Sequence, residues 1–207
     1  MAAGYYADLY LHFLPDMLLP SVFFMIILLG AFVITYPKYD IAHVAEAFFA
    51  FYYVAVMLSY LYRTRSLPFG IYLVWLIFLC SWGADTAAYC VGVVFGKHKM
   101  TPVLSPKKSI EGAIGGIAGS MLFVLLFALL FGDSMMLTLD QKFLLAAGGG
   151  VCAAISMIGD LAASAIKRNY DIKDYGNIIP GHGGILDRFD SVIITAPIIY
   201  YICRVFI

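Results

Sequence analysis

The chain has 207 residues, of which 63% are hydrophobic and only 13% are charged, and its mean hydropathy is +0.91. Soluble domains carry about a quarter charged residues, so this composition excludes an ordinary soluble fold and indicates an integral membrane protein. The formal net charge is zero, so the chain lacks the excess of positive charge that is typical of nucleic-acid-binding proteins. We therefore predict an all-α, polytopic transmembrane helix bundle that forms a single integral membrane domain over residues 1–207.

In chain order, the tyrosine-rich residues 1–17 are predicted to form an interfacial lead-in. A helix needs about 20 apolar residues to cross the hydrocarbon core of a bilayer. Six stretches qualify, at residues 18–36, 43–62, 69–92, 113–132, 143–167 and 191–207. Alternate connections must then lie on opposite sides of the membrane.

The basic residues are distributed unequally between the two sides. One side has Lys38, Lys97, Lys99, Lys107, Lys108, Lys167, Arg168, Lys173 and Arg188, whereas the other has Arg63, Arg65 and Lys142. The positive-inside rule makes the richer side cytoplasmic. The short loops and compact size favour a bacterial inner membrane, and we expect any active site formed by the charge-rich connections to face the cytoplasm.

Two carboxylates lie inside predicted spans. Asp85 and Asp160 are each about seven residues from the cytoplasmic end of their span, or roughly 10 Å at 1.5 Å per residue. An ionisable group inside a span costs several kcal/mol and is a functional candidate by default. Two carboxylates at matched depth could share a cation. The alternative is that each forms a hydrogen bond with a neighbouring helix.

A polar stripe continues from Asp160 toward the cytoplasm. Ser164, Lys167 and Arg168 follow Asp160 at i+4, i+7 and i+8, which places all four on one helical face. Carboxylates suit Mg²⁺, which also binds phosphate oxygens, and Lys and Arg suit the phosphates. The stripe therefore resembles a combined metal and phosphate site. A helix end with cations that extend to the membrane surface explains it equally well.

The block before the last span is glycine-rich and charged, with Gly181, His182, Gly183, Gly184, Asp187, Arg188 and Asp190. Its glycines allow a ligand to approach the backbone closely, and a helix start offers free N–H groups to anions. The carboxylates and the arginine again suit a metal and phosphates. Alternatively, an aspartate caps the helix, and His182 makes only a structural hydrogen bond.

A third polar block, at residues 96–116, contains Lys107, Lys108 and Ser109. Ser105 or Ser109 could cap the helix that follows, and the start of that helix would accept phosphate. The block lacks the glycine spacing of a P-loop. As a basic loop, it is also explained by topology or by contact with anionic lipid.

The run from Ser164 to Asp190 resembles the signature of the phosphatidate cytidylyltransferase family, also called CDP-diacylglycerol synthases. The signature is met by Ser164, Ile166, Lys167, Arg168, Lys173, Asp174, Gly176, Ile179, Pro180, His182, Gly183, Gly184, Ile185, Asp187, Arg188, Phe189 and Asp190. The upstream stretches DTAAYCVGVVFGK and SPKKSIEG are similar to the same family, so residues 81–191 form the expected catalytic region. The family usually has more than six spans, which is the one departure.

The resemblance implies that CTP and phosphatidic acid give CDP-diacylglycerol and pyrophosphate, with Mg²⁺ as the cofactor. Asp160 and Asp187 would hold the metal, with Asp85 as a further candidate and with room for a second cation. The remaining expected catalytic residues are Ser164, Lys167, Arg168 and Arg188, and the expected substrate-binding residues are Lys107, Lys108, Ser109, Lys173, His182, Gly183, Gly184 and Asp190. The sequence does not assign the Lys107–Ser109 block to CTP or to the lipid headgroup.

Three other functions fit the sequence less well than a cytidylyltransferase does. A CTP-dependent lipid-alcohol kinase, of the dolichol or phytol type, shares the Ser-Pro-Lys and Gly-Asp regions but would release CDP. A transporter built on Asp85 and Asp160 would need polar residues in both halves of the membrane, whereas here they gather on one side. A CDP-alcohol phosphotransferase is disfavoured because its multi-aspartate helix motif is absent. The sequence leaves a homodimer open.

Overall fold

A computed structural model describes residues 2–11, 19–176 and 183–206 of the chain. The prediction of an all-α polytopic bundle is confirmed, because nearly every described element is a helix. The chain divides into two compact units, Met1–Ser59 and Tyr60–Ile207, which are described separately.

The first unit contains α1 (Ala2–Leu11), α2 (Leu19–Thr35), α3 (Ile41–Ala50), the π-helix η1 (Phe51–Val56) and the start of α4 (Met57–Arg65). Asp40 starts α3 by accepting hydrogen bonds from the backbone N–H groups of Ala42 and His43, at 3.1 and 3.3 Å, as an N-cap residue does. Within the predicted lead-in, Tyr5 is buried against Phe51 and Ala55. The interfacial position of the lead-in stays a prediction.

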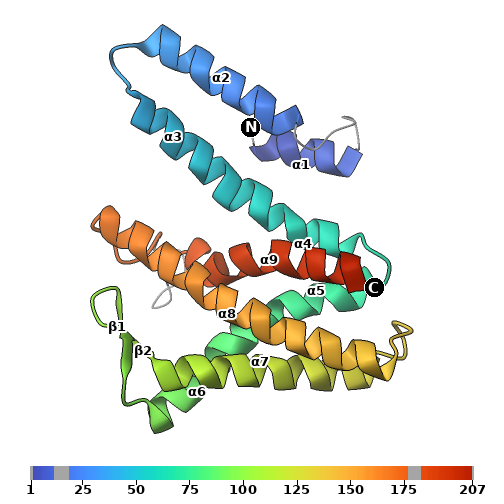
Figure 1. Ribbon diagram of the computed structural model, residues 1–207. Coiled ribbons are helices and arrows are strands. Elements are labelled where there is room, and N and C mark those ends of the chain that lie inside the picture. Colours follow the sequence, from blue (N-terminus) through green and yellow to red (C-terminus); the bar gives the residue numbers. More distant parts are fainter. Residues whose placement is uncertain (1, 12–18, 177–182, 207) are drawn as a thin grey trace. The chain divides into compact units, whose positions relative to one another are not determined.

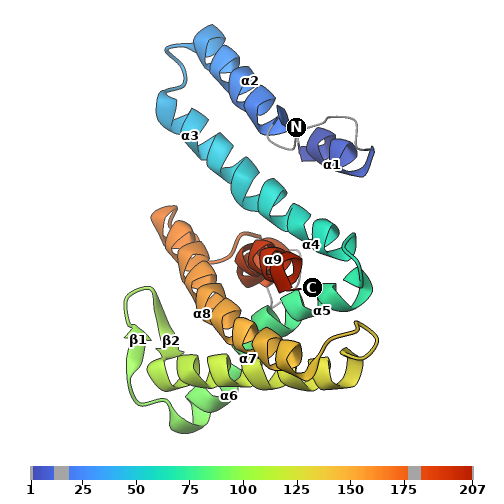
Figure 2. The same cartoon turned by 45° about the vertical axis from the view of Figure 1, so that its right-hand side comes forward.

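The second unit contains the rest of α4, α5 (Gly70–Phe78), the π-helix η2 (Leu79–Gly83) and α6 (Ala84–Phe95). The strands β1 (Lys99–Thr101) and β2 (Ser105–Ser109) follow, and then α7 (Ile110–Phe131), α8 (Leu139–Asn169) and α9 (Leu186–Phe206). Helix α7 packs against both α6 and α8, and α8 packs against α9, as Figures 1 and 2 show from two directions.

Four helical segments among the described residues are long and apolar enough to cross a membrane, namely Ile41–Arg65, Gly70–Phe95, Ile110–Phe131 and Leu139–Asn169. They correspond to the four central predicted spans. The first predicted span is the shorter apolar helix Leu19–Thr35. The last is α9, which carries Asp187, Arg188 and Asp190 near its start.

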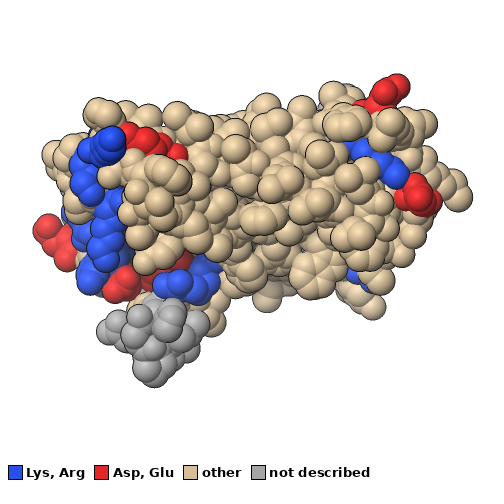
Figure 3. All heavy atoms as spheres, turned by 90° about the horizontal axis from the view of Figure 1, so that it is seen from below, with Lys and Arg blue, Asp and Glu red and all other residues tan. Residues whose placement is uncertain are grey.

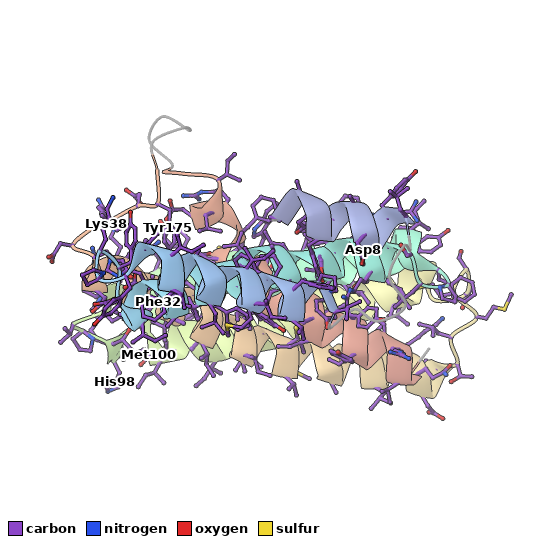
Figure 4. All side chains as sticks on the ribbon, turned by 90° about the horizontal axis from the view of Figure 1, so that it is seen from above. Asp8, Phe32, Lys38, His98, Met100 and Tyr175 are labelled. Atoms are coloured by element: carbon purple, nitrogen blue, oxygen red, sulfur yellow. The ribbon has the colours of Figure 1, made fainter. Side chains whose placement is uncertain are left out.

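Charge is segregated along the second unit. Seen from below, Lys, Arg, Asp and Glu gather mainly at the end that carries β1 and β2, a few lie at the opposite end, and an uncharged surface separates them (Figure 3). His98, Met100 and Tyr175 all lie at the charged end (Figure 4). This pattern matches a protein whose middle contacts lipid and whose polar site lies at one end.

Close packing of α6 on α7 fixes the position of the site. Gly116 lies against α6, and a Cβ at this position would come within 2.9 Å of the Ala84 carbonyl oxygen. Ser120 of α7 donates a hydrogen bond to the Gly149 carbonyl of α8 at 3.1 Å. These contacts hold the start of α6 next to the middle of α8, where Asp85 and Asp160 lie.

Candidate active site

Three carboxylates from different helices lie close enough to interact electrostatically at the charged end of the second unit. Asp85 comes from α6, Asp160 from α8 and Asp190 from near the start of α9. The negative charges of Asp85 and Asp160 lie close enough to interact, and both act on Asp190. The Ser191 hydroxyl donates a hydrogen bond to Asp85 Oδ2 at 3.2 Å, which ties α9 to α6. We call Asp85, Asp160 and Asp190 the acidic cluster.

Two lysines offset part of this negative charge. Lys108, at the end of β2, forms an ion pair with Asp160. Lys167, in the last turn of α8, has its Nζ 2.8 Å from Asp187 Oδ1 and 4.0 Å from Asp190 Oδ2. Each cation therefore bridges the carboxylates to a neighbouring element, as expected where charges lie at membrane depth.

Asp187 is held by donors on three sides. In addition to Lys167, the backbone N–H groups of Tyr175 and Gly184 donate to its Oδ2, at 2.8 and 2.9 Å. These donors offset the negative charge of the Asp187 carboxylate, whose side chain is only 3% exposed.

The glycine turn before α9 is shaped around this carboxylate. Gly183 has φ +80°, which residues with a side chain rarely adopt. A Cβ at Gly183 would also lie 3.1 Å from Asp187 Oδ2. The turn thus brings the backbone against the Asp187 carboxylate, and its close approach to a ligand stays a prediction. His182 and Gly181 lie outside the described residues.

A first pocket of about 630 Å³ opens between α6, the β1–β2 hairpin, the start of α7 and the middle of α8. Three lysines line this hairpin pocket together with two members of the acidic cluster and two serines: Lys99, Lys107, Lys108, Asp85, Asp160, Ser105 and Ser109. The Ser109 hydroxyl accepts a hydrogen bond from Gly112 N at 3.1 Å and so caps α7. One of the two capping candidates is confirmed.

A second pocket of about 560 Å³ lies where α6 meets the start of α9. Two aromatic residues, Trp82 and Phe189, line this tryptophan pocket together with Arg188 and Thr86. It also contains two carboxylates already described, at Asp187 and Asp190, and Asp85 lines both pockets. Both cavities therefore border the acidic cluster and share Asp85.

The predicted site residues are only partly brought together. Asp85 and Asp160 interact within the acidic cluster, and Lys167 connects Asp187 to Asp190 at the edge of that cluster. Ser164, Arg168 and Lys173 line neither of the two pockets. Arg168 donates to the Ile172 carbonyl at 3.3 Å, where α8 ends, and Lys173 is exposed.

Sequence reasoning missed two features of the site. The first is Trp82, whose Nε1 donates to the Arg188 carbonyl at 2.9 Å and whose ring packs edge-on to Phe189, with centroids 5.9 Å apart. The second is the β1–β2 hairpin, which contributes Lys99 to the hairpin pocket. A tryptophan three residues before Asp85 within a predicted span was the available signal for Trp82, since its ring carries a polar N–H that needs a partner.

Comparison with known proteins agrees with the signature in the sequence. The cytidylyltransferase family matches residues 3–206. A phosphatidate cytidylyltransferase of Staphylococcus saprophyticus is 37% identical over 188 residues, which is 89% of this chain and 68% of that protein. One of Staphylococcus haemolyticus is 39% identical over 175 residues, covering 84% of this chain and 64% of that protein.

A third relative is similar to this chain over a shorter stretch. A phosphatidate cytidylyltransferase of Staphylococcus aureus is 37% identical over 150 residues, covering 71% of this chain and 54% of that protein. The chain therefore spans between 54 and 68% of the length of these relatives.

Proposed function

Because the chain belongs to the cytidylyltransferase family, we propose that it joins CTP to phosphatidate and releases CDP-diacylglycerol and pyrophosphate. The observation that carries the proposal is the acidic cluster, which lies between two pockets and is accompanied by Lys108 and Lys167. This arrangement offers room for two phosphate-bearing substrates next to groups that can hold a divalent cation. The apolar surface of the helices would bring the lipid substrate to the site from the membrane.

The carboxylates fit a magnesium ion. No group of three or more His, Cys, Asp or Glu side chains is poised to enclose a metal within the described ranges. Magnesium does not need such a cage, since it keeps several waters and binds through one or two carboxylates together with substrate phosphates. Asp160 and Asp187 are the proposed ligands, with Asp85 as a further one. A bound divalent cation would neutralise charge that develops on the phosphates.

In the proposed step, an oxygen of the phosphatidate phosphate attacks the α-phosphorus of CTP in line. A new P–O bond forms, the bond between the α-phosphorus and the oxygen that bridges it to the β-phosphate breaks, and its electron pair leaves with pyrophosphate. A phosphate monoester is already an anion near neutral pH, so no strong base is needed. Catalysis then depends on position and charge neutralisation, as in other phosphoryl transfers.

The basic residues have separate tasks in this step. Lys167 fixes Asp187 and Asp190 relative to one another, and its ammonium would contact a phosphate when a cation occupies the carboxylates. Lys107 and Lys108 face the hairpin pocket and would neutralise phosphate oxygens there. Arg188 would do the same in the tryptophan pocket. The charged end that carries these groups would face the cytoplasm of a bacterial inner membrane, where CTP is available.

An assay with purified protein in detergent, phosphatidate and CTP labelled at the α- or γ-phosphate tests the proposal. We expect label from the α-phosphate in the lipid product, pyrophosphate release, and loss of both when EDTA removes Mg²⁺. Transfer of the γ-label to lipid with release of CDP would instead identify a lipid kinase and refute the proposal.

A further inference from the structure

The two pockets differ in where they lie along α6. The hairpin pocket includes Val93, two residues before α6 ends at Phe95, whereas the tryptophan pocket reaches back to Trp82. At about 1.5 Å per residue, Trp82 is roughly 20 Å along the helix from Phe95. Trp82 therefore lies farther from the hairpin than Val93 does, although both pockets reach Asp85.

The two pockets also differ in charge. The hairpin pocket has three lysines, Lys99, Lys107 and Lys108. Several cations in one cavity suit a triphosphate, which carries more negative charge than a phosphate monoester. The tryptophan pocket has one basic residue, Arg188, next to the carboxylates of Asp85, Asp187 and Asp190. A guanidinium can bind a single phosphate group through two parallel hydrogen bonds, and a divalent cation held by the carboxylates would offset their charge.

The aromatic walls of the tryptophan pocket point to an amphipathic ligand. The Trp82 side chain is 45% exposed, although its N–H is bonded to the Arg188 carbonyl. Tryptophan is typical of the boundary between lipid headgroups and hydrocarbon. The ring packs against Phe189 on the same wall. An apolar face next to an arginine fits the glycerol and first carbons of a phospholipid with its phosphate.

We propose that the tryptophan pocket receives the phosphate headgroup of the lipid substrate and that the hairpin pocket receives the triphosphate of the nucleotide. This assignment rests on the proposed function. Asp85 lines both pockets, so the lipid phosphate and the α-phosphorus meet at the acidic cluster. Trp82 acts by positioning, because it holds the Arg188 backbone and forms the apolar wall.

The kinetic test separates the two substrates. Trp82→Ala should raise KM for phosphatidate about tenfold, a change of 1.4 kcal/mol in binding, and leave KM for CTP unchanged. Trp82→Phe, which keeps an aromatic ring but not the N–H, should have a KM for phosphatidate between those of Trp82→Ala and the unmodified protein. Lys107→Gln should have the opposite effect, raising KM for CTP alone. Trp75→Phe, which alters the other tryptophan of the chain and lies outside both pockets, is the matched control.

A binding measurement does not depend on turnover. In the Trp75→Phe protein, Trp82 is the only tryptophan, and brominated lipids quench tryptophan fluorescence on contact. Brominated phosphatidate should quench Trp82 more strongly than brominated phosphatidylcholine at the same mole fraction in mixed micelles. Equal quenching by the two lipids, or a Trp82→Ala effect confined to KM for CTP, would overturn the assignment.

The two measurements also separate this inference from the proposed function. Selective quenching by phosphatidate in a protein that makes no CDP-diacylglycerol would refute the function and support the lipid pocket. Synthesis of CDP-diacylglycerol with equal quenching would support the function and refute the pocket assignment. Neither result depends on whether Trp82→Ala folds, because the quenching experiment leaves Trp82 in place.

Discussion

Lys167 Nζ lies 2.8 Å from Asp187 Oδ1, although the two residues are 20 positions apart in the sequence. The ion pair connects the last turns of α8 to the first turn of α9, across a chain reversal that contains the glycine turn. It is almost fully enclosed, with 12% of the lysine side chain and 3% of the aspartate side chain exposed. The pair therefore determines how the α9 carboxylates meet the acidic cluster.

Replacing this lysine should destabilise the fold. Lys167→Met would leave the Asp187 charge buried and supported only by two backbone N–H groups, which we expect to cost about 3 kcal/mol of unfolding free energy. Thermal unfolding in detergent measures this cost. Lys97→Met, at an exposed lysine of the same unit, is the control and should unfold at the original temperature. Identical unfolding of the two variants would show that the pair contributes nothing to stability.

Asp160 should be required for the reaction itself. Asp160→Asn keeps the size of the side chain but removes the charge that would bind a cation, so CTP-dependent product should fall to background while the protein stays folded. Asp140→Asn, at an exposed aspartate in the first turn of the same helix, should keep full activity. The same test applies to Asp187→Asn, and Lys167→Ala should lose less activity than either. Full activity in Asp160→Asn would remove that residue from the metal site.

Much of the architecture was predictable from local sequence. Hydropathy located the central spans, and the spacing from Asp160 to Arg168 correctly placed these residues on one continuous helix. Ser109, one of the two serines expected to cap the helix that follows, is its N-cap residue. Such features depend on neighbours within a turn or two, which the sequence displays directly.

The missed features depend on residues far apart in the chain or on an irregular helix. The π-helix η2 lies immediately before α6, and a π-turn shifts the register of the side chains before it. A regular helical pattern therefore does not place Trp82 next to Arg188, which is 106 residues away. The ion-pair partner of each site carboxylate could not be predicted either. Lys108, for example, pairs with Asp160 from the β1–β2 hairpin, which is distant from Asp160 in the sequence.

The glycine turn should not tolerate a side chain at Gly183. Gly183→Ala would place a Cβ in a backbone conformation with φ +80° and 3.1 Å from Asp187 Oδ2, at a cost of about 1–2 kcal/mol. The Asp187 carboxylate would have to move, so we expect a large fall in the initial rate together with only a small fall in the unfolding temperature. Gly176→Ala is the matched control, since its Cβ would meet only Gly184 Cα at an ordinary 3.6 Å. Measured unfolding temperatures and initial rates that are equal for both variants would contradict this account of the turn.

Packing between α6 and α7 should affect the acidic cluster from a distance. Gly116→Ala would place a Cβ 2.9 Å from the Ala84 carbonyl oxygen and 3.0 Å from Ala88 Cβ, which forces the helices apart at a cost of about 2 kcal/mol. Asp85 follows Ala84 directly, so its distance from Asp160 should increase and turnover should fall.

Gly148→Ala provides the comparison for this packing effect. Its Cβ would meet Ile202 Cγ2 at 3.5 Å, an ordinary contact, and alanine is about 1 kcal/mol more favourable than glycine inside a helix. We therefore expect Gly148→Ala to unfold at the same or a higher temperature and to retain its turnover. Because both changes add one methyl group to an apolar helix, a loss of activity confined to Gly116→Ala would trace the effect to the α6–α7 contact. Equal losses in the two variants would show instead that the site does not depend on this contact.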